Sequence, residues 1–490
     1  MTWISSRRIT SLVTCVCLSL AASPNAAWAS GCPGSPDQSQ GPDVIVGVLS
    51  QDAIANYTSA GGIEAFSMGT TSCNMGNTNL NWISQPSNLH PVIGQNLFRM
   101  KLVNGSRRFE HLGQSWLKHG FFALSQTACC VSCSGTSGNA LGVGCSDPYT
   151  SSRNGGQGSL GPKWQVNATT GVHTHPIANP GWSGTVARRL QVKTADLEVS
   201  NGSGDVNATR YFGEAQYIAA DDAAAGHHNN NASYRPISVS GSGSAWSFTA
   251  IGSTQREEAG IRAWKDTDNT VSEADVMTQE DNGATALVIV AAQATNLGGG
   301  IYHYEYAIQN LNSDRSIGSV SIPIRPDANI TNVEFHDVDY HSGDGINNVT
   351  YDGTDWPSTI ANSSVTWATQ DFAVNQNANA LRWGTLYNFR FDADVAPWPG
   401  KGTVTMSYFK PGVNPNATVQ TVTPYPCIHG DMNGDAVVDG VDITLFIDRL
   451  LLGGPSFQEL CAGDVEAVRD GIINLDDVPN FSDCLLNSGC

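Results

Sequence analysis

The residues with the clearest chemistry are oxygen-bearing side chains near the C-terminus. In the segment 431–442, DMNGDAVVDGVD, they recur at nearly alternate positions. Calcium takes roughly six to eight oxygen ligands, and a tight loop directs alternate side chains inward while a backbone carbonyl completes the set. We therefore expect a calcium loop here, with the backbone carbonyl of Val437 as one ligand. The expected side-chain ligands are Asp431, Asn433, Asp435, Asp439 and Asp442.

The residues after this loop predict an amphipathic helix. Ile443, Phe446, Ile447 and Leu450 recur at helical spacing, and the Gly-Gly-Pro segment at 453–455 ends the pattern. The last acid of the loop also begins the helix. An ion held by the acids would therefore fix the start of the helix that carries the apolar face.

A second copy of the pattern follows. The segment 470–486, DGIINLDDVPNFSDCLL, repeats the segment 435–451, DAVVDGVDITLFIDRLL. The repeat predicts a second calcium loop followed by a second helix. Its expected ligands are Asp470, the backbone carbonyl of Ile472, Asn474 and Asp477.

The first half of this second loop departs from the pattern. Counting back from Asp470 places Glu466 and Val468 at the first and third positions of the loop. Val468 has no side-chain oxygen, so the second loop is expected to be degenerate, with a weak or lost site. The alternative is a longer loop in which Asp464 supplies the first ligand.

The paired loop–helix pattern closely resembles a type I dockerin. Dockerins are calcium-dependent modules that dock secreted proteins onto cohesin-bearing partners. The resemblance covers residues 427–490 and implies a small all-α, calcium-binding domain. It also implies a cohesin-like or other cell-surface protein as the partner. Because dockerin-bearing proteins are often polysaccharide-degrading enzymes, it directs attention to polysaccharide as a target of the remaining chain.

The charge of the chain fits cation binding and argues against nucleic acid. The 490-residue chain has a net charge of −19, and residues 427–490 carry 12 Asp or Glu against two Arg. Nucleic-acid binding needs a basic surface, so nucleic acid is not expected as a partner. A short segment with this much negative charge either stays solvated or collects cations.

Residues 1–29 predict a cleaved signal peptide. Arg7 and Arg8 precede an apolar run, and the AWA segment ending at Ala29 offers small residues at the cleavage site. The run is shorter than the roughly 18–20 residues that span a bilayer, which disfavours a membrane anchor. A lipoprotein with Cys32 as the lipidated residue is a weaker alternative, because Ala29 is smaller than the aliphatic residue expected there. We therefore expect a secreted, extracellular or cell-surface protein with no membrane span in the mature chain.

The cysteines predict disulfides. Removal of the signal peptide leaves ten of the 12 cysteines, six in an N-terminal group and four in a C-terminal group, and both groups can pair in an oxidising compartment. A zinc site at Cys130 and Cys133 is disfavoured because no second CxxC motif completes four thiolates. Three pairings are open for the C-terminal cysteines, which are Cys427, Cys461, Cys484 and Cys490.

The rest of the chain predicts a mainly β body. The chain contains 51 Gly, and short β-like runs alternate with turn residues. The Asn104-Gly105 pair between two such runs predicts a hairpin, and several turn-separated strands favour an antiparallel β-sandwich. The expected organisation is an N-terminal β-rich domain with long Gly-rich loops at 30–283, a β-sandwich-like domain at 284–420, a Pro-rich linker at 421–426 and the dockerin-like domain at 427–490.

Signals of catalysis are weak, since no GxSxG, HExxH or P-loop motif is present. His173 and His175 have the HxH spacing used by copper and zinc sites, but no third ligand can be paired with them from sequence. The other histidines considered are His111, His119, His227, His228, His336 and His341. Glycoside hydrolysis needs two carboxylates beside the scissile bond. The candidate carboxylates are Glu214, Asp221, Asp222, Glu305, Asp337 and Asp339.

Two functional hypotheses follow. The first is a calcium-binding docking protein whose β-rich body is a binding or structural domain directed at polysaccharide, with the aromatic residues of GTDWPS and LRWGTLYNF as a stacking face. The alternative is a secreted carbohydrate-active enzyme, or a His-dependent metalloenzyme, that carries the docking module. The lack of a catalytic motif favours a body that is not an enzyme.

Overall fold

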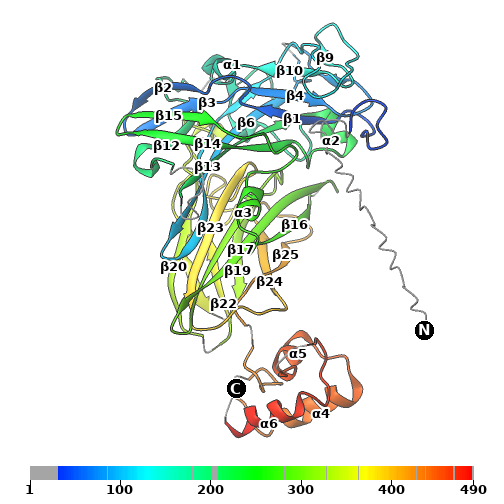
Figure 1. Ribbon diagram of the computed structural model, residues 1–490, viewed down its shortest axis with the longest axis vertical. Coiled ribbons are helices and arrows are strands. Elements are labelled where there is room, and N and C mark those ends of the chain that lie inside the picture. The colour runs from blue at the N-terminus through cyan, green and yellow to red at the C-terminus, as the bar shows by residue number, and fades with distance from the viewer. Residues whose placement is uncertain are drawn as a thin grey trace, which may run out of the picture.

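A computed structural model describes most of the chain, and the expected signal peptide lies outside the described residues. These residues are 31–84, 87–177, 181–200, 208–280, 283–326, 328–361, 363–425, 427–435, 437–466 and 470–487. The structure confirms a mainly β fold with a small helical region at the C-terminal end (Figure 1). Within those ranges, no helix is both long enough and apolar enough to cross a membrane.

The N-terminal part of the body is a set of antiparallel sheets around one core. A seven-stranded sheet has the order β11-β8-β6-β13-β14-β15, with β7 paired to β6, and three-stranded sheets β1-β4-β10 and β12-β3-β2 contribute to the same core. The strands are β1 (Val44–Leu49), β2 (Ala55–Ala60), β3 (Ile63–Ser67), β4 (Thr70–Asn74), β5 (Leu80–Asn81), β6 (Val92–Val103), β7 (Ser106–Gln114), β8 (Leu117–His119), β9 (Ala140–Leu141), β10 (Ser146–Tyr149), β11 (Leu160–Gly161), β12 (Leu190–Lys193), β13 (Arg210–Ile218), β14 (Ala232–Ser242) and β15 (Ala245–Ala250).

Helices in the body are short. They lie between strands and do not form a layer of their own. The α-helices are α1 (Ser151–Asn154), α2 (Ala220–Ala225) and α3 (Arg262–Thr267), and the 3₁₀ turns are Gln157–Ser159, Lys163–Gln165, Thr194–Asp196 and Ile346–Asn348.

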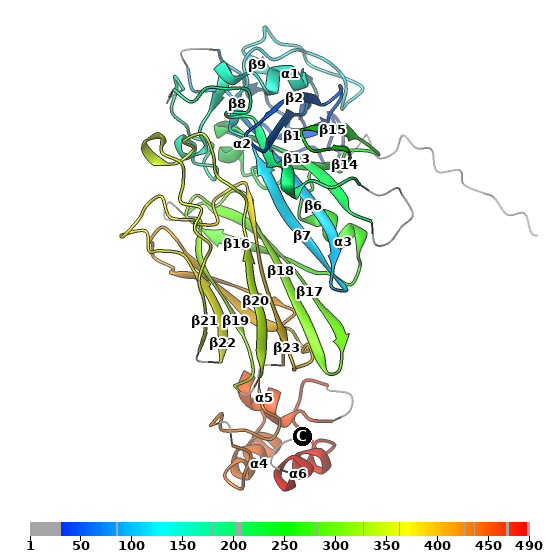
Figure 2. The same ribbon diagram turned by 90° about the vertical axis from the view of Figure 1, so that its left-hand side faces the viewer.

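The β6–β7 hairpin confirms the turn predicted at Asn104-Gly105. Val103 pairs with Ser106, and the two turn residues have φ of 51° and 89°. A tight type I′ hairpin turn requires positive φ at both central residues, which Asn and Gly tolerate. The hairpin extends from the N-terminal sheets along the second part of the body, where β7 lies against β18 and β23 (Figure 2).

The second part of the body is a β-sandwich, as predicted. Two five-stranded antiparallel sheets, β16-β17-β18-β23-β20 and β21-β22-β19-β24-β25, enclose a core that includes Tyr306, Trp367 and Phe389. β16 pairs with β17 and so belongs to the sandwich. The sandwich therefore begins at Ser272, which lies within the range 30–283 expected for the N-terminal domain. Its strands are β16 (Ser272–Gln279), β17 (Thr285–Gly298), β18 (Ile301–Asn310), β19 (Ile317–Pro323), β20 (Ile330–His336), β21 (Ser358–Ala361), β22 (Ser364–Ala368), β23 (Thr385–Ala393), β24 (Gly402–Tyr408) and β25 (Asn416–Thr421).

The segment between the sandwich and the helical region is packed against the body. The backbone N–H of Tyr425 donates to the carbonyl of Ala396 at 3.1 Å. Tyr425 also shares a buried cluster with Val395 and Cys427. The described part of the expected linker is therefore anchored to the end of the sandwich.

The described part of the C-terminal region contains the helices α4 (Asp442–Leu452), α5 (Phe457–Gly463) and α6 (Val478–Leu486). The predicted helices after both loops are therefore present. Phe446 of α4 and Phe481 of α6 lie at the centre of a small core of their own, which contains apolar residues from both loops. At the start of α5, Ser456 and Glu459 form a reciprocal capping box that satisfies N–H groups at the helix start.

Disulfides join the described cysteines in both groups, as expected for an oxidising compartment. The cysteines of the CCVSC segment are all in disulfides, which excludes the zinc alternative for that segment. In the C-terminal group, Cys427 pairs with Cys461, whereas Cys490 lies outside the described residues. The bonds in which both cysteines are among the described residues are Cys32–Cys130, Cys73–Cys129, Cys133–Cys145 and Cys427–Cys461.

Candidate functional site

The first predicted calcium loop is closed by two buried acids. Asp442, the first residue of α4, accepts hydrogen bonds from the backbone N–H groups of Asn433 at 3.1 Å and Asp439 at 3.0 Å. Asp431 accepts from the N–H of Gly434 at 2.7 Å. Asp431 and Asp442 are both buried, and the bond from Asn433 to Asp442 joins the two ends of the loop.

The remaining predicted ligands of this loop are exposed. Asn433 Oδ1 accepts from the N–H of Asp435 at 2.9 Å, and Asp435 Oδ1 accepts from the N–H of Val437 at 2.9 Å. Asp439 Oδ1 accepts from a backbone N–H in the same way. The structure therefore gathers all the predicted side chains in one loop. Among the described residues, however, no three acids of this loop bring oxygen atoms within 4.8 Å of one another.

The second loop repeats the hydrogen bonds of the first. Asp477 accepts from the N–H of Glu466 at 3.0 Å and from the N–H of Asn474 at 2.9 Å. These bonds match those that Asp442 accepts in the first loop. Glu466 therefore occupies the place of Asn433, the third position of the loop.

The core confirms this register. Met432 and Val465 each follow the first acid of their loop, and both are buried in the module core. Val438 and Ile473 each precede the ninth position and are buried in the same core. The first position of the second loop is therefore Asp464. Of the two alternatives that the sequence left open, this register is the longer loop that begins at Asp464, and it does not place Glu466 first.

The second loop is longer than the first. From Asp431 to Asp442 the first loop has 12 residues, whereas from Asp464 to Asp477 the second has 14. The extra residues fall between Glu466 and the acid at 470, so Val468 belongs to an insertion and lies outside the described residues. The two apolar residues within each loop, Met432 and Val438 or Val465 and Ile473, were the sequence signal that could have revealed this register.

The acids of the second loop converge more closely than those of the first. Asp464, Glu466 and Asp470 offer oxygen atoms that all lie within 4.8 Å of one another. Asp464 is 6% exposed, and its Oδ1 is buried without a hydrogen-bond partner among the described residues. Burial, together with the nearby charges of Asp477 and Asp470, raises the pKa of Asp464. A buried acceptor without a donor, among like charges, is the arrangement that a cation relieves.

Both loops offer only oxygen donors, which fits a hard cation such as calcium. In the first loop the donors would be the predicted set of Asp431, Asn433, Asp435, Asp439 and Asp442 with the Val437 carbonyl. In the second loop Asp464 and Glu466 would join the predicted set of Asp470, Asn474 and Asp477 with the Ile472 carbonyl. When bound, the ion would offset the negative charge of the loops and hold the start of α4 and α6.

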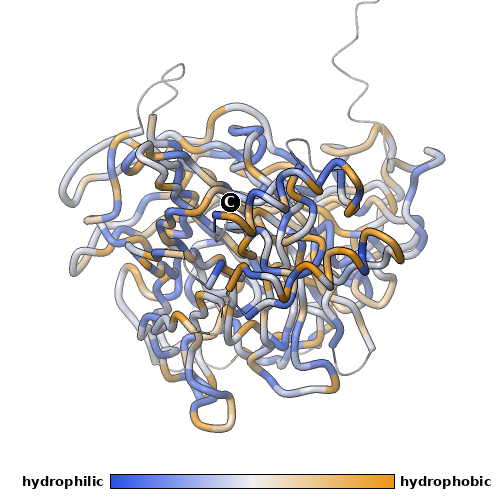
Figure 3. Tube along the Cα trace, turned by 90° about the horizontal axis from the view of Figure 1, so that it is seen from below, coloured by the Kyte–Doolittle hydropathy of each residue, from blue (hydrophilic) through white to orange (hydrophobic). Residues whose placement is uncertain are grey.

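The helix α4 is apolar on two sides. Phe446 faces the module core and is 3% exposed, whereas Ile443, Ile447 and Leu451 are 40%, 45% and 74% exposed. The last three residues are spaced by four and so lie along one side of the helix. Figure 3 shows the hydrophobic residues of this module from the C-terminal end of the molecule. The exposed stripe on α4 is a surface suited to contact with another protein.

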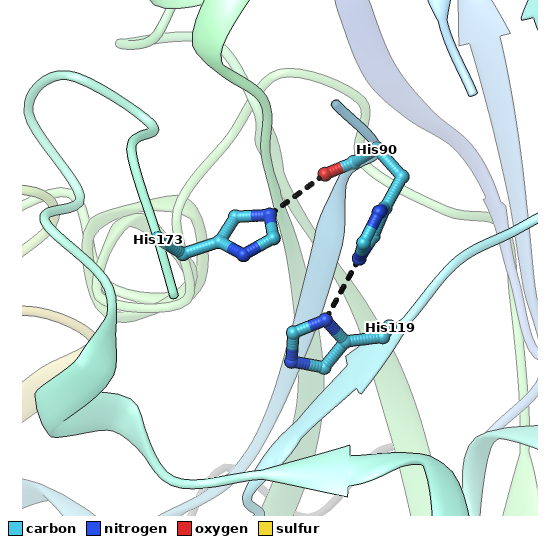
Figure 4. A group of neighbouring side chains, drawn as sticks. All are labelled: His90, His119 and His173. Atoms are coloured by element: carbon cyan, nitrogen blue, oxygen red, sulfur yellow. Dashed lines mark hydrogen bonds between the residues drawn. The ribbon is translucent and has the colours of Figure 1, made fainter. Parts of the chain in front are cut away.

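A separate cluster of histidines lies in the N-terminal part of the body. His90, His119 and His173 have ring nitrogens that all lie within 4.8 Å of one another, and each residue is at most 3% exposed (Figure 4). His90 Nε2 is 2.8 Å from His119 Nδ1. His173 Nε2 donates to the backbone carbonyl of His90 at 3.0 Å. The structure therefore brings one member of the predicted HxH pair together with two partners that are distant in sequence.

The environment keeps two of these rings neutral at neutral pH. Burial, with the neighbouring rings of His173 and His175, lowers the pKa of His90 to about 3. Burial, with His173 and His90, lowers the pKa of His119 to about 2. Neutral imidazole is the form that binds a metal ion. His90 was missed in the sequence because it stands alone in a loop before β6.

The other candidate histidines do not converge. His111 is fully buried, and its ring nitrogens face Gly113 and the N–H of Leu386. His341 donates to the carbonyl of Gln114 at 2.9 Å. His227, His228 and His336 also lie apart from the cluster, since they form no group of three metal-binding side chains among the described residues.

The candidate catalytic carboxylates are used by the fold. Glu214 is completely buried and accepts from Asn96 at 2.7 Å and Gln309 at 2.8 Å. Glu305 forms an ion pair with Arg390 at 2.8 Å. The other candidates likewise have structural partners, which are Asn81 for Asp221, Val44 and Asn231 for Asp222, Asn379 for Asp337 and Lys193 for Asp339. Each of these candidates therefore has a hydrogen-bond or ion-pair partner within the fold.

The aromatic residues proposed for sugar stacking are inside the fold. Trp356 is 3% exposed, and its ring stacks on Phe335 with an interplanar angle of 14°. Trp383 and Tyr387 are also buried. The two sequence segments therefore build core rather than an exposed aromatic strip.

Comparisons with known proteins assign no family. No family model matches the chain, and no curated protein matches it. A solved structure of the exo-beta-D-glucosaminidase CsxA, inhibited by a glucosamine-configured castanospermine, aligns with 75% of this chain at 8% identity and a TM-score of 0.12. The aligned region is 26% of that enzyme's chain. A TM-score this low carries no argument about fold or function.

Proposed function

We propose that this chain is an extracellular calcium-binding protein that docks its β-rich body onto a partner through the C-terminal module. The observation that carries the proposal is the repeated architecture of the two loops. Each loop has a buried acid at the first residue of a helix or just before it, and that acid accepts N–H groups from equivalent loop positions. The similarity to type I dockerins rests on the same residues.

The chemistry of both loops supports calcium as the ion. Every side-chain donor is an oxygen, and the loop segments lie in a region with 12 acids against two Arg. In the second loop, the convergence of Asp464, Glu466 and Asp470 and the unpartnered Asp464 Oδ1 favour a bound cation. We therefore propose two calcium ions per chain, with the second loop active through its longer form.

The exposed stripe on α4 supports a docking role. Ile443, Ile447 and Leu451 present apolar side chains to solvent on a module that already has its own core. The folding of the module does not explain these exposed apolar side chains, and exposed apolar patches often mark sites of contact with another protein. We propose that it contacts a cohesin-like protein with a complementary apolar surface. A polysaccharide target for the body stays a prediction from the resemblance alone.

Calcium-dependent capture tests the docking role. The full chain is immobilised and exposed to the extracellular fraction of its source, once with calcium and once with a chelator. We expect a partner that is retained only with calcium and is lost with Ile447→Glu. The control Thr359→Glu adds the same charge on β21, whose residues are all exposed, and should retain the partner. Equal capture with the chelator, or by the Ile447→Glu variant, would contradict docking through this surface.

A further inference from the structure

We propose that His90, His119 and His173 form a binding site for a divalent transition-metal ion, with Zn²⁺ as its test ion. The site lies in the N-terminal part of the body, is built of nitrogen donors and does not depend on the calcium loops or on docking. The metal site can therefore be tested independently of the proposed function.

The fold assembles the site from three separate segments. His90 precedes β6, and His119 is the last residue of β8, which pairs with β6 in the register Val92 to His119. His173 lies opposite Val166 in an isolated bridge. The backbone positions of the three histidines are thus set by the pairing of β6 with β8 and by the bridge at His173. Figure 4 shows the three side chains as neighbours that come from separate segments of the chain.

The spacing of the nitrogens fits one ion. Ligand nitrogens at about 2.0–2.1 Å from a tetrahedral ion lie about 3.3 Å from one another. The His90–His119 nitrogen pair is 2.8 Å apart, and the whole set lies within 4.8 Å. Small rotations of the rings would bring all three nitrogens to a shared ion, without a change of backbone.

The hydrogen bonds of His173 leave a nitrogen available for the metal. Both ring nitrogens of His173 face backbone carbonyls, Nε2 that of His90 at 3.0 Å and Nδ1 that of Thr174 at 3.4 Å. A neutral ring carries one proton, and the shorter contact assigns it to Nε2, so Nδ1 carries the lone pair. A backbone carbonyl that fixes the tautomer of a histidine is the usual outer partner of a metal ligand.

The His90–His119 pair can also turn two lone pairs toward an ion. One proton lies between His90 Nε2 and His119 Nδ1 when the ion is absent. On binding, this proton moves to the outer nitrogen of its own ring, so both rings stay neutral. His90 Nδ1, one of these outer nitrogens, is buried and has no hydrogen-bond partner among the described residues.

The surroundings favour a transition metal over calcium. Phe121 packs edge-on against His90 with ring centroids 4.4 Å apart, which gives the site an apolar wall. The ring of His175 lies 5.0 Å from that of His90, and both of its nitrogens are buried without partners among the described residues. His175 therefore lies beside the site, although its nitrogens are outside the group that converges within 4.8 Å. Imidazole donors select zinc, copper or nickel rather than calcium.

Metal titration of the full chain tests the site. The chain is stripped with a chelator, dialysed and titrated with Zn²⁺, and bound metal is measured by elemental analysis. We expect one Zn²⁺ per chain in this region and a loss of affinity of at least about 100-fold in His119→Ala and in His173→Ala, because loss of even an outer-shell partner costs about 10–100-fold. The control His227→Ala removes a histidine outside the cluster and should bind like the wild type.

Co²⁺ provides a second readout that does not depend on variant folding. The wild-type chain should show the visible absorption of four-coordinate Co²⁺, and Zn²⁺ should displace it. Calcium stoichiometry, measured on the same variants, reports whether the C-terminal module is intact. Absence of Zn²⁺ binding and of the Co²⁺ absorption in the wild type, or equal affinity in folded His119→Ala, would show a hydrogen-bonded histidine core and overturn the proposal.

Discussion

Phe446 of α4 and Phe481 of α6 stack face to face, with ring centroids 3.8 Å apart and an interplanar angle of 12°. Each ring stands four residues after the last acid of its loop, which is Asp442 or Asp477. The stack therefore joins the two loop–helix units into one core. Because each helix begins at its loop acid, the packing of the helices and the geometry of the loops support each other.

Replacement of the stacked ring tests this coupling. Phe446→Ala leaves a cavity in the module core, and we expect a loss of about 3–5 kcal/mol in the free energy of unfolding of the module. Helical circular dichroism follows the module, because long helices are confined to it in the described chain. Leu451→Ala is the control, since Leu451 is 74% exposed on the same helix. An equal effect of both substitutions would contradict the core assignment.

The Cys427–Cys461 disulfide should stabilise the module independently of calcium. The bond joins cysteines 34 positions apart, and a loop of this length contributes about 4 kcal/mol in the chain-entropy account. The double variant Cys427→Ser/Cys461→Ser should therefore lower the thermal midpoint of the helical signal both with calcium and with a chelator. The midpoint of the β-rich body serves as the internal control. No change in the helical midpoint would argue against this pairing.

A buried ion-pair network between the hairpin and the sandwich predicts acid sensitivity. Glu110 of β7 pairs with Arg99 at 2.8 Å and with Arg390 of β23 at 3.2 Å. Burial opposes ionisation of Glu110, but His336, Arg99 and Arg390 lower its pKa to about 2. Burial lowers the pKa of His336 itself, so the two guanidinium groups dominate at neutral pH.

The sign of the pH effect follows from this shift. A carboxyl whose pKa falls from 4.5 to about 2 on folding contributes stability above pH 4.5 that is lost as the pH falls toward 2. At neutral pH, we expect Glu110→Gln to be less stable than the wild type by on the order of 3 kcal/mol. The difference in stability between the wild type and Glu110→Gln should disappear as the pH falls, which thermal unfolding of the body at a series of pH values would measure. A difference that is constant with pH would contradict the assignment.

Local patterns in the sequence predicted local structure well. The pair Asn104-Gly105 favours a tight turn by itself, and apolar residues at the helical spacing of Ile443, Ile447 and Leu450 favour a helix. Both elements could therefore be predicted without knowledge of distant contacts. The spacing did not reveal that α4 has two apolar sides. Phe446 enters the core, whereas Ile447 is exposed.

Long-range and inserted features could not be predicted in the same way. His90 meets His119 and His173 only because β6 pairs with β8, and one sequence does not specify that pairing. In the second loop, the sequence left open whether the loop begins at Glu466 or, in a longer form, at Asp464, because the repeat could be counted back from Asp470 without an insertion. Trp356 was a candidate for sugar stacking because composition does not tell a buried aromatic residue from an exposed one.

Calcium titration calorimetry on the full chain is the most direct test of the central claim, that both C-terminal loops hold calcium. We predict two ions per chain for the wild type and for the control Asp448→Ala, an exposed acid outside the loops. Each of the single variants Asp442→Ala, Asp477→Ala and Asp464→Ala should bind one calcium ion. The double variant Asp442→Ala/Asp477→Ala should bind none. Absence of calcium binding by the wild type, or two ions retained by the double variant, would contradict the account.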